Sequence, residues 1–360
     1  MYQKIRKFFT RYERYFSPLM LLFGFVFDNL TLRRVDFWAE NLVIIIYLGL
    51  ALISIILINI HASGRLRHRF FAKTTIWLSL LLQFVFGGLW SAFFIFYFRG
   101  ASLALSWPFL LMLLALLIGN ETFRERYSRL VFQLSIFFTA LFSYSIFAIP
   151  LLFKKIGPDM FVLSGLASLA IFAAAAILAF RLIPERFRKS RLPLVFSITS
   201  IYLIFNFFYF FNLIPPLPLS LNEIGIYHSL RSAGGKYTVS YEPAPWYRFW
   251  ADTSPIFHWR PGAPVYCLST IFAPADFSLG IKHRWSHYDE NVKVWTVKDE
   301  LSFPLTGGRA GGYRGYSLKY GVEPGRWRID VLTDTDRALG RINFQIVETE
   351  DKLEFKSEIK

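Results

Sequence analysis

The first 214 residues contain a series of long hydrophobic runs that are bounded by charged residues. A helix needs roughly 20 apolar residues to cross about 30 Å of hydrocarbon, because it rises about 1.5 Å per residue. Six runs meet this requirement, and they are Asn41–Ile60, Thr74–Phe98, Ala101–Gly119, Leu130–Phe153, Met160–Phe180 and Leu192 to about Ile214. The mean hydropathy of the chain, +0.39, is also higher than soluble globular proteins show. The sequence therefore predicts a membrane protein.

A seventh, shorter run extends from Phe16 to Leu32 and includes Asp28. It has no small-residue cleavage site after its apolar stretch, so we interpret it as a retained signal anchor rather than a signal peptide. With it, residues 16–214 are expected to form an all-α bundle of about seven transmembrane helices. Residues 1–15 place apolar and basic side chains on opposite sides of a helix, which predicts a basic amphipathic cytoplasmic segment on the bilayer surface. A solvated basic tail is the alternative.

The net charge of +15 is concentrated between the hydrophobic runs. Up to residue 221 there are 22 Lys and Arg against 8 Asp and Glu, whereas the remainder has 18 against 17. In the seven-span arrangement the N-terminal tail and alternate loops hold 17 basic residues, and the other loops hold 5. By the positive-inside rule the N-terminus is cytoplasmic, and an odd number of spans places the C-terminal region outside. The same distribution excludes a nucleic-acid-binding stripe.

Chemically reactive groups are scarce in the predicted spans. Asp28 is the only acidic residue within one of them, and an intramembrane carboxylate is a candidate functional group because its burial is costly. Asp28 also lies near the outer end of its run, where it can reach interfacial water. We prefer this interpretation, in which the carboxylate is hydrated and has no functional role. The uncharged amides are expected to join helices by hydrogen bonds, and they are Asn59, Gln83, Gln133 and Asn206.

After the last span the composition becomes that of a soluble domain. Residues 215–221 hold three prolines and predict a stiff, extended stalk. Residues 222–350 contain short alternating runs separated by turn residues, which favour an all-β, sandwich-like extracytoplasmic domain. The seven runs are Tyr237–Glu242, Pro264–Phe272, Ile281–Tyr288, Val292–Val297, Tyr313–Tyr320, Arg326–Thr333 and Arg341–Val347. Residues 351–360 are expected to be a frayed tail.

The single cysteine, Cys267, cannot form an intrachain disulfide, and its alternation with apolar residues predicts a buried structural side chain. His283 and His287 share a strand face with Trp285, but positions four apart on a strand are about 13 Å apart. The two histidines cannot both bind one ion from a regular strand. No metal site, catalytic residue or cofactor is therefore predicted.

The glycine-rich stretch 307–319 has two possible roles. Its backbone could form a nest for an anion, with Arg309, Arg314 or Lys319 supplying positive charge. Alternatively it is a hairpin loop that enters a strand carrying Tyr316, and this is the preferred interpretation because no helix follows.

Two tryptophans lie on either side of a short turn at residues 289–291. A three-residue loop with Asn291 in the left-handed conformation would pair Trp285 with Trp295 across the hairpin. The paired indoles could be a core wedge, which is preferred, or an exposed platform beside His287 and Lys293. An exposed platform would suit a periplasmic glycan or an acidic peptide.

Several motifs resemble an uncharacterised bacterial family, the domain-of-unknown-function family 2914. They are the stalk through His228, the His283-Arg284-Trp285 triplet, the stretch Gly311–Ser317 and the segment Gly325–Arg328. The resemblance implies a polytopic bacterial inner-membrane protein with a periplasmic C-terminal domain, and it implies no activity.

Taken together, these features favour a non-enzymatic membrane protein that presents a periplasmic binding or interaction module. Its expected partners are the lipid bilayer and a glycan, peptide or protein. A transporter or intramembrane enzyme acting through the helices, with Asp28 as its ionisable centre, is the alternative. The candidate ligand-binding residues are Trp285, Trp295, His283, His287, Arg309, Arg314, Tyr316 and Lys319.

Overall fold

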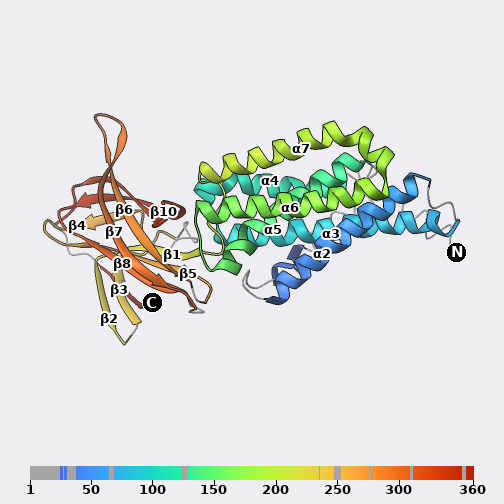
Figure 1. The fold of residues 1–360 in the computed structure, drawn as a ribbon. Coiled ribbons are helices and arrows are strands. Elements are labelled where there is room, and N and C mark those ends of the chain that lie inside the picture. The colour runs from blue at the N-terminus through green and yellow to red at the C-terminus, as the bar shows by residue number, and fades with distance from the viewer. Residues whose placement is uncertain are drawn as a thin grey trace. The chain divides into compact units, whose positions relative to one another are not determined.

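The computed structural model divides the chain into two compact units. The residues it describes are 25–26, 28–30, 38–64, 69–122, 129–234, 236–246, 253–275, 277–308, 311–350 and 354–360. One unit is helical and comprises Met1–Arg99 with Trp107–Leu217. The other comprises Gly100–Ser106 with Pro218–Lys360 and contains all the strands in Figure 1.

The six clear hydrophobic runs are all helical. The helices are α2 (Trp38–Ala62), α3 (Arg69–Gly100), α4 (Leu103–Thr122), α5 (Leu130–Phe153), α6 (Pro158–Leu182) and α7 (Pro184–Phe210). Within these bounds α2, α3, α5, α6 and α7 are long and apolar enough to cross a membrane, whereas the apolar part of α4, Leu105–Asn120, is shorter. In the seventh run residues 25–26 and 28–30, which include Asp28, are helical. The predicted amphipathic segment 1–15 lies outside the described residues.

Local sequence explains where several helices begin and end. Pro158 and Pro184 stand at the first positions of α6 and α7, where the missing N–H leaves no hydrogen bond unmade. Lys154 ends α5 in the left-handed conformation, with φ of 53°, and its N–H donates to the Pro150 carbonyl. These breaks give short connections, so consecutive helices α5, α6 and α7 pack against one another.

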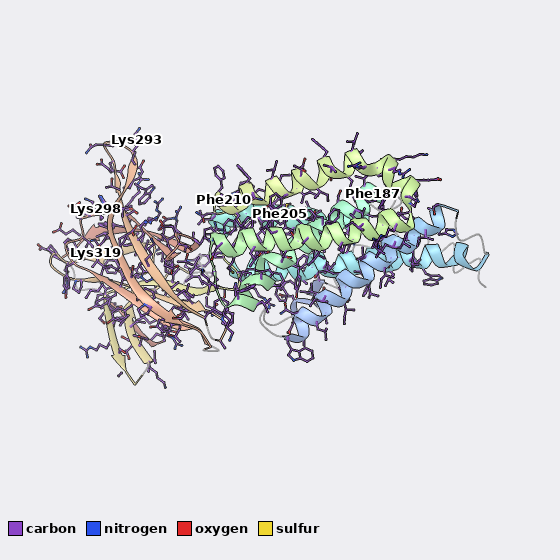
Figure 2. The ribbon with its side chains drawn as sticks, viewed as in Figure 1. Phe187, Phe205, Phe210, Lys293, Lys298 and Lys319 are labelled. Atoms are coloured by element: carbon purple, nitrogen blue, oxygen red, sulfur yellow. The ribbon has the colours of Figure 1, made fainter. Side chains whose placement is uncertain are left out.

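Helix α5 is the central element of the helical unit and contacts α2, α6 and α7. Its Phe142 ring stacks on Phe205 of α7 at 4.8 Å between centroids, and Phe205 is buried where Figure 2 labels it. The amide of Asn59 on α2 donates to Gln133 Oε1 on α5 over 2.5 Å. A buried amide pair of this kind joins two helices, as the sequence led us to expect.

In the residues that the structure describes, the β-rich unit contains eleven strands. They are β1 (Ser220–Tyr227), β2 (Ser229–Ala233), β3 (Lys236–Tyr241), β4 (Ile256–Trp259), β5 (Val265–Phe272), β6 (Ser278–Asp289), β7 (Val294–Thr306), β8 (Tyr313–Lys319), β9 (Gly325–Thr333), β10 (Ala338–Glu348) and β11 (Lys356–Ile359). All seven runs expected to be strands are strands. The sequence did not predict β1, β2, β4 and β11.

These strands form three sheets. One has the order β1-β5-β8, the second β4-β10-β9-β6-β7, and the third β11-β3-β2. β4 pairs with β10 in parallel, and the other pairings are antiparallel. β7 is an edge strand, which explains how it accommodates Pro304 without losing a ladder hydrogen bond.

The middle sheet, β1-β5-β8, packs on both of its faces. Cys267 of β5 joins the core shared with the five-stranded sheet, whose large members include Trp285 and Trp327. The next residue, Leu268, points the other way and packs with Val239 of the third sheet. The unit is therefore a three-layer arrangement, one sheet more than the two-sheet sandwich that the sequence predicted. Cys267 is free and buried, as expected.

Two expectations at the ends of this unit are wrong. The predicted stalk is not extended throughout, because the Leu217 N–H donates to the Pro215 carbonyl in a tight turn and β1 already begins at Ser220. The predicted frayed tail contains β11, which pairs with β3 from Lys356 to Ile359. Backbone hydrogen bonds order this segment although its own composition is polar.

The hairpin between β6 and β7 has a different register from the one predicted. Its four-residue loop spans 290–293, and Lys293, not Asn291, is left-handed, with φ of 56°. The Asp289 carboxylate accepts the N–H groups of Asn291 and Val292 and so fixes the turn. Tyr288 consequently pairs with Trp295, and a bulge further along pairs Trp285 with Asp299. The expected Trp285 to Trp295 pairing is absent; Figure 2 labels Lys293 at the hairpin tip.

Candidate functional site

The outer face of the five-stranded sheet carries a polar and aromatic surface. On β9, Trp327 and Ile329 point into the core, so Arg326, Arg328 and Asp330 point outward. On β10, Phe344 and Ile346 point inward, and alternation therefore directs three polar side chains outward, namely Arg341, Asn343 and Gln345. Core packing thus presents this polar set on one face.

Strand register brings these side chains into two adjacent rows. Arg328 lies opposite Asn343, and Arg326 lies opposite Gln345. Asp330 lies opposite Arg341, whose Nε donates to its carboxylate over 2.5 Å. Guanidinium groups therefore alternate with carboxamides across neighbouring strands, and both kinds of group are hydrogen-bond donors.

A cleft of about 440 Å³ opens over this surface. It is lined by Pro255, Trp295, Arg326, Trp327, Arg328, Arg341, Asn343, Phe344 and Gln345. An aromatic wall comes from the hairpin, where the rings of Tyr288 and Trp295 meet edge to face at 5.2 Å. The cleft thus combines an indole, guanidinium groups and amides.

The arginines stack on the aromatic wall. The Arg326 guanidinium lies 3.8 Å from the centre of the Tyr288 ring, and that of Arg328 lies 4.7 Å from the Trp295 ring. Cation–π contacts of this kind are worth about 0.5–1 kcal/mol at exposed sites and hold the guanidinium planes in place. The donors are therefore arranged before any ligand arrives.

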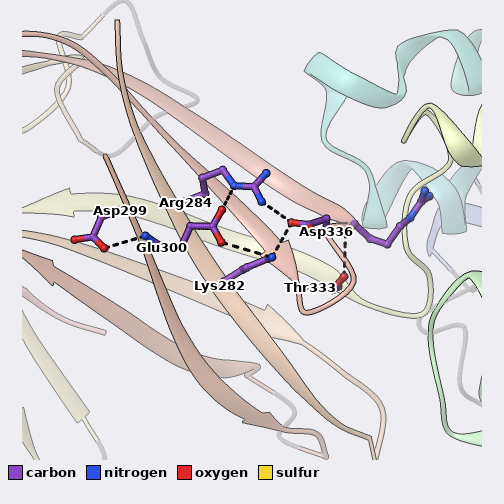
Figure 3. A network of polar contacts seen from close by, with 7 residues as sticks. Lys282, Arg284, Asp299, Glu300, Thr333 and Asp336 are labelled. Atoms are coloured by element: carbon purple, nitrogen blue, oxygen red, sulfur yellow. Dashed lines mark hydrogen bonds and ion pairs between the residues drawn. The ribbon is translucent and has the colours of Figure 1, made fainter. Parts of the chain in front are cut away.

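Among the described residues, the three arginines that line the cleft outnumber their carboxylate partners by one. Lys282 and Arg284 are balanced by Glu300 and Asp336, in the network shown in Figure 3. Arg326 is balanced by Glu290, through bonds of 2.9 and 3.1 Å.

Asp330 is shared by two arginines. Its two oxygens face the Nε atoms of Arg341 and Arg328, so one carboxylate serves two guanidinium groups. Arg328 Nε is 3.2 Å from this carboxylate but makes no hydrogen bond with it, and the atom is buried. Burial, and then repulsion from Arg341 and Arg284, lower the pKa of Arg328 despite the attraction of Asp330. Among the described side chains that line the cleft, the surplus positive charge lies at Arg328 and Arg341.

The residues singled out in the sequence separate into core and surface. Trp285 and His283 are fully buried, and the Trp285 indole donates to Ser317 Oγ over 3.1 Å. Trp295 lines the cleft, on the opposite side of the sheet from Trp285. His287 is half-buried and packs against the Trp327 ring at 4.9 Å. The core interpretation is confirmed for Trp285, and the structure does not make Trp295 its partner.

The first two glycines of the glycine-rich stretch use their N–H groups within the fold and do not offer them to an anion. The N–H groups of Gly307 and Gly308 donate to the carbonyls of Phe277 and Ala273. A Cβ on Gly307 would lie 1.9 Å from the Pro274 carbonyl oxygen, so glycine is required for this close approach. The preferred loop interpretation explains both observations.

The other residues of that stretch lie away from the cleft. Arg314, Tyr316 and Lys319 are on β8, in the middle sheet. The Lys319 ammonium pairs with Asp299 at 3.1 Å, and Tyr316 is exposed. Arg309 lies outside the described residues.

Sequence reasoning missed the polar part of the cleft. Arg326, Arg328 and Asp330 alternate with core residues, as do Arg341, Asn343 and Gln345. Two strands whose alternate positions are all polar, with three arginines among them, could have indicated a shared outer face. That signal was present, but the order of strands in the sheet was unknown.

A second polar cluster links the third and the five-stranded sheets. Glu242 accepts from His228 over 2.8 Å, and its other oxygen pairs with His258 Nδ1 at 2.6 Å. Burial raises the pKa of the Glu242 carboxyl, but hydrogen bonds from both histidines more than offset this and the net pKa is lowered. In the described part of the chain, no group of three or more His, Cys, Asp or Glu side chains is placed to hold a metal ion.

His283 makes the β-rich unit sensitive to acid. Its ring lies between the hydroxyls of Ser269 and Ser317, both at 2.8 Å, and burial lowers its pKa to about 3. The unfolded chain protonates this ring near pH 6.5, so the stabilisation is complete above that pH and is lost as the pH falls toward 3. We expect the unfolding free energy to fall by about 1 kcal/mol between pH 7 and 5.5. Denaturant titration checks this, and His283→Gln should remove that part of the slope; an unchanged slope would contradict it.

Residues 280–346 match a family described as protein of unknown function (DUF2914). This confirms, for the C-terminal region, the resemblance indicated by the sequence motifs. The matched segment extends from β6 to β10 and so contains most of the cleft. No curated protein matches the chain.

Solved structures give only remote likenesses. A β-glucosidase from Listeria innocua in complex with gluconolactone is 12% identical with a TM-score of 0.19, and the match covers 34% of this chain and 16% of that one. The DNA glycosylase AlkC from Pseudomonas fluorescens, bound to DNA with an abasic site analog, is 12% identical with a TM-score of 0.24, covering 75% and 80%. Likenesses this remote carry no argument about fold or function.

Proposed function

We propose that the chain is a multi-pass protein of the bacterial inner membrane with a cytoplasmic N-terminus and a periplasmic β-rich unit. Within the described ranges of the chain, five helices are long and apolar enough to cross a bilayer. Their outward faces expose large apolar side chains, among them Trp77, Leu192 and Phe196, each more than 70% exposed. Apolar surface of this extent suits contact with lipid hydrocarbon. The division of 17 basic residues against 5 supports this orientation.

The β-rich unit serves, in this proposal, as a non-enzymatic binding module, and the cleft on its five-stranded sheet is the site. The observation that carries the proposal is the surplus positive charge at Arg328 and Arg341 beside the part-exposed indole of Trp295. A guanidinium group pre-positioned by stacking loses little freedom when it binds a carboxylate or phosphate. The cleft is therefore suited to a ligand with an anionic group and a flat apolar face.

Melting of the full-length protein in neutral-lipid nanodiscs tests the binding function. Polygalacturonate, polyglutamate and polyphosphate serve as three acidic probes. Because a ligand of the folded state raises the melting temperature, we expect at least one probe to raise that of the β-rich unit by about 2 °C or more. The shift should shrink in Arg328→Gln and persist in Arg231→Gln, which alters an exposed arginine on β2. If no probe raises the melting temperature of the wild-type protein, or if the two variants show equal shifts, the proposal fails.

A further inference from the structure

We propose that the ligand of the cleft is an acidic carbohydrate bearing a single carboxylate where it contacts Arg328 and Arg341. This inference rests on the binding function proposed above and names its ligand class. It follows from three properties of the cleft. They are its charge, its position on a sheet face, and the polar grid formed by Arg326, Arg328, Asn343 and Gln345.

The charge of the cleft fits one anionic group. The described arginines that line the cleft and their carboxylate partners leave one positive charge, because Asp330 is shared by two arginines. One carboxylate would neutralise this surplus, whereas a polyanion would bring the other charges close to Glu290 and Asp330. Guanidinium groups such as those of Arg328 and Arg341 bind carboxylates with matched geometry.

The polar grid fits a molecule with several hydroxyl groups. Asn343 and Gln345 are exposed and two positions apart, so their side chains stand about 7 Å apart along β10. Arg328 and Arg326 stand beside them on β9, about 4.8 Å away across the ladder. This grid has the dimensions of a sugar ring, and each carboxamide both donates and accepts, as hydroxyl groups require.

The aromatic wall supplies an apolar contact for the same ring. Trp295 borders the cleft and is part-exposed, with Arg328 over one region of its indole. A sugar ring presents C–H groups on its faces, which can pack against an aromatic side chain while its hydroxyl groups remain in the polar grid. An indole, amides and guanidinium groups in one cleft match the mixed surface of an acidic sugar.

The location of the cleft argues against an acidic peptide. Extended peptides gain affinity by adding a strand to an exposed sheet edge, where backbone groups are unpaired. The rows of the cleft lie on the face of the sheet, where β9 pairs with β10 and, from Trp327 to Thr333, with β6, and β10 pairs with β4 from Gln345 to Glu348. A ligand on this face meets side chains, so a peptide backbone would lose water without gaining a ladder of partners.

The test measures dissociation constants of the full-length protein in neutral-lipid nanodiscs for three probes. They are a neutral sugar oligomer carrying one galacturonic acid unit, the same oligomer with that carboxylate methyl-esterified, and a glutamate peptide of equal charge. We expect the acidic oligomer to bind at least about tenfold more tightly than either of the others, since a charge-assisted hydrogen bond is worth about 1.5–3 kcal/mol. Asn343→Ala and Trp295→Ala should each weaken it about fivefold or more, whereas Tyr320→Ala, an exposed aromatic residue outside the cleft, should not.

Each other outcome is decisive. Tighter binding of the glutamate peptide, lost in Arg328→Gln, would overturn the carbohydrate inference and leave the proposed function standing with an acidic peptide as ligand. Equal binding of the esterified oligomer would overturn the acidic character of the ligand. Failure of all three probes would overturn this inference together with the proposed function. Because Asn343 is exposed, its variant remains informative even if Trp295→Ala fails to fold.

Discussion

Trp285→Ala is expected to lower the unfolding free energy of the β-rich unit by about 3–5 kcal/mol. The side chain is fully buried and packs edge to face on Trp327 and Phe344, at 6.4 Å between ring centres in both cases. Its removal would leave a cavity between two sheets and would deprive Ser317 of an indole donor. Since small domains are stable by only about 5–15 kcal/mol, the variant should be close to unfolding at 37 °C.

Trp295→Ala is the matched control. This indole is part-exposed and contacts Arg328 and Tyr288, so its loss should cost about 1 kcal/mol. Proteolysis of the full-length protein in increasing urea measures both variants without separating the units. Equal losses in the two variants would mean that the sheet faces are assigned incorrectly.

Asp330→Asn should lower the unfolding free energy by about 2–3 kcal/mol. The carboxylate is only 4% exposed, and its loss would leave Arg328 and Arg341 close together without their shared partner. Removing one partner of a buried ion pair costs about 3–5 kcal/mol, and the part-exposure of the two arginines reduces this.

An exposed ion pair on the same face provides the comparison. Glu290→Gln removes the partner of Arg326, and both side chains are at least half exposed, so the loss should be within about 1 kcal/mol. Adding Arg341→Gln to Asp330→Asn should restore part of the stability, because it removes one of the two uncompensated charges. A double variant less stable than Asp330→Asn would contradict this account of the cleft's electrostatics.

Long runs with a regular hydrophobic pattern predicted the secondary structure well. The six hydrophobic runs and the seven alternating runs each last long enough for their period to be read. The missed strands β2, β4 and β11 are only four or five residues long, too short for alternation to be seen. These short strands form because they pair with distant segments of the chain, as β11 does with β3.

The candidate site could be predicted only in part for a related reason. Trp295 was identified, but its neighbours depend on the register of the hairpin. That register is set by Asp289, which fixes the turn, and by a bulge near Trp285. A strand displaced by one residue exchanges its two faces, so the predicted pairing put both tryptophans on one face. The arginines of β9 and the amides of β10 became neighbours only through the order of strands in the sheet.

Cysteine labelling that determines on which side of the membrane the β-rich unit lies tests the proposed function most directly. The only cysteine, Cys267, is fully buried and the protein as it stands should resist a membrane-impermeant maleimide, which gives a built-in control. Val292→Cys places a thiol in the exposed hairpin loop, and Lys189→Cys places one at an exposed position in the basic N-terminal part of α7. In intact spheroplasts, we expect Val292→Cys to be labelled and Lys189→Cys to be labelled only after the membrane is permeabilised. Labelling of Lys189→Cys in intact spheroplasts, with Val292→Cys protected until permeabilisation, would contradict a binding module held outside the cytoplasm.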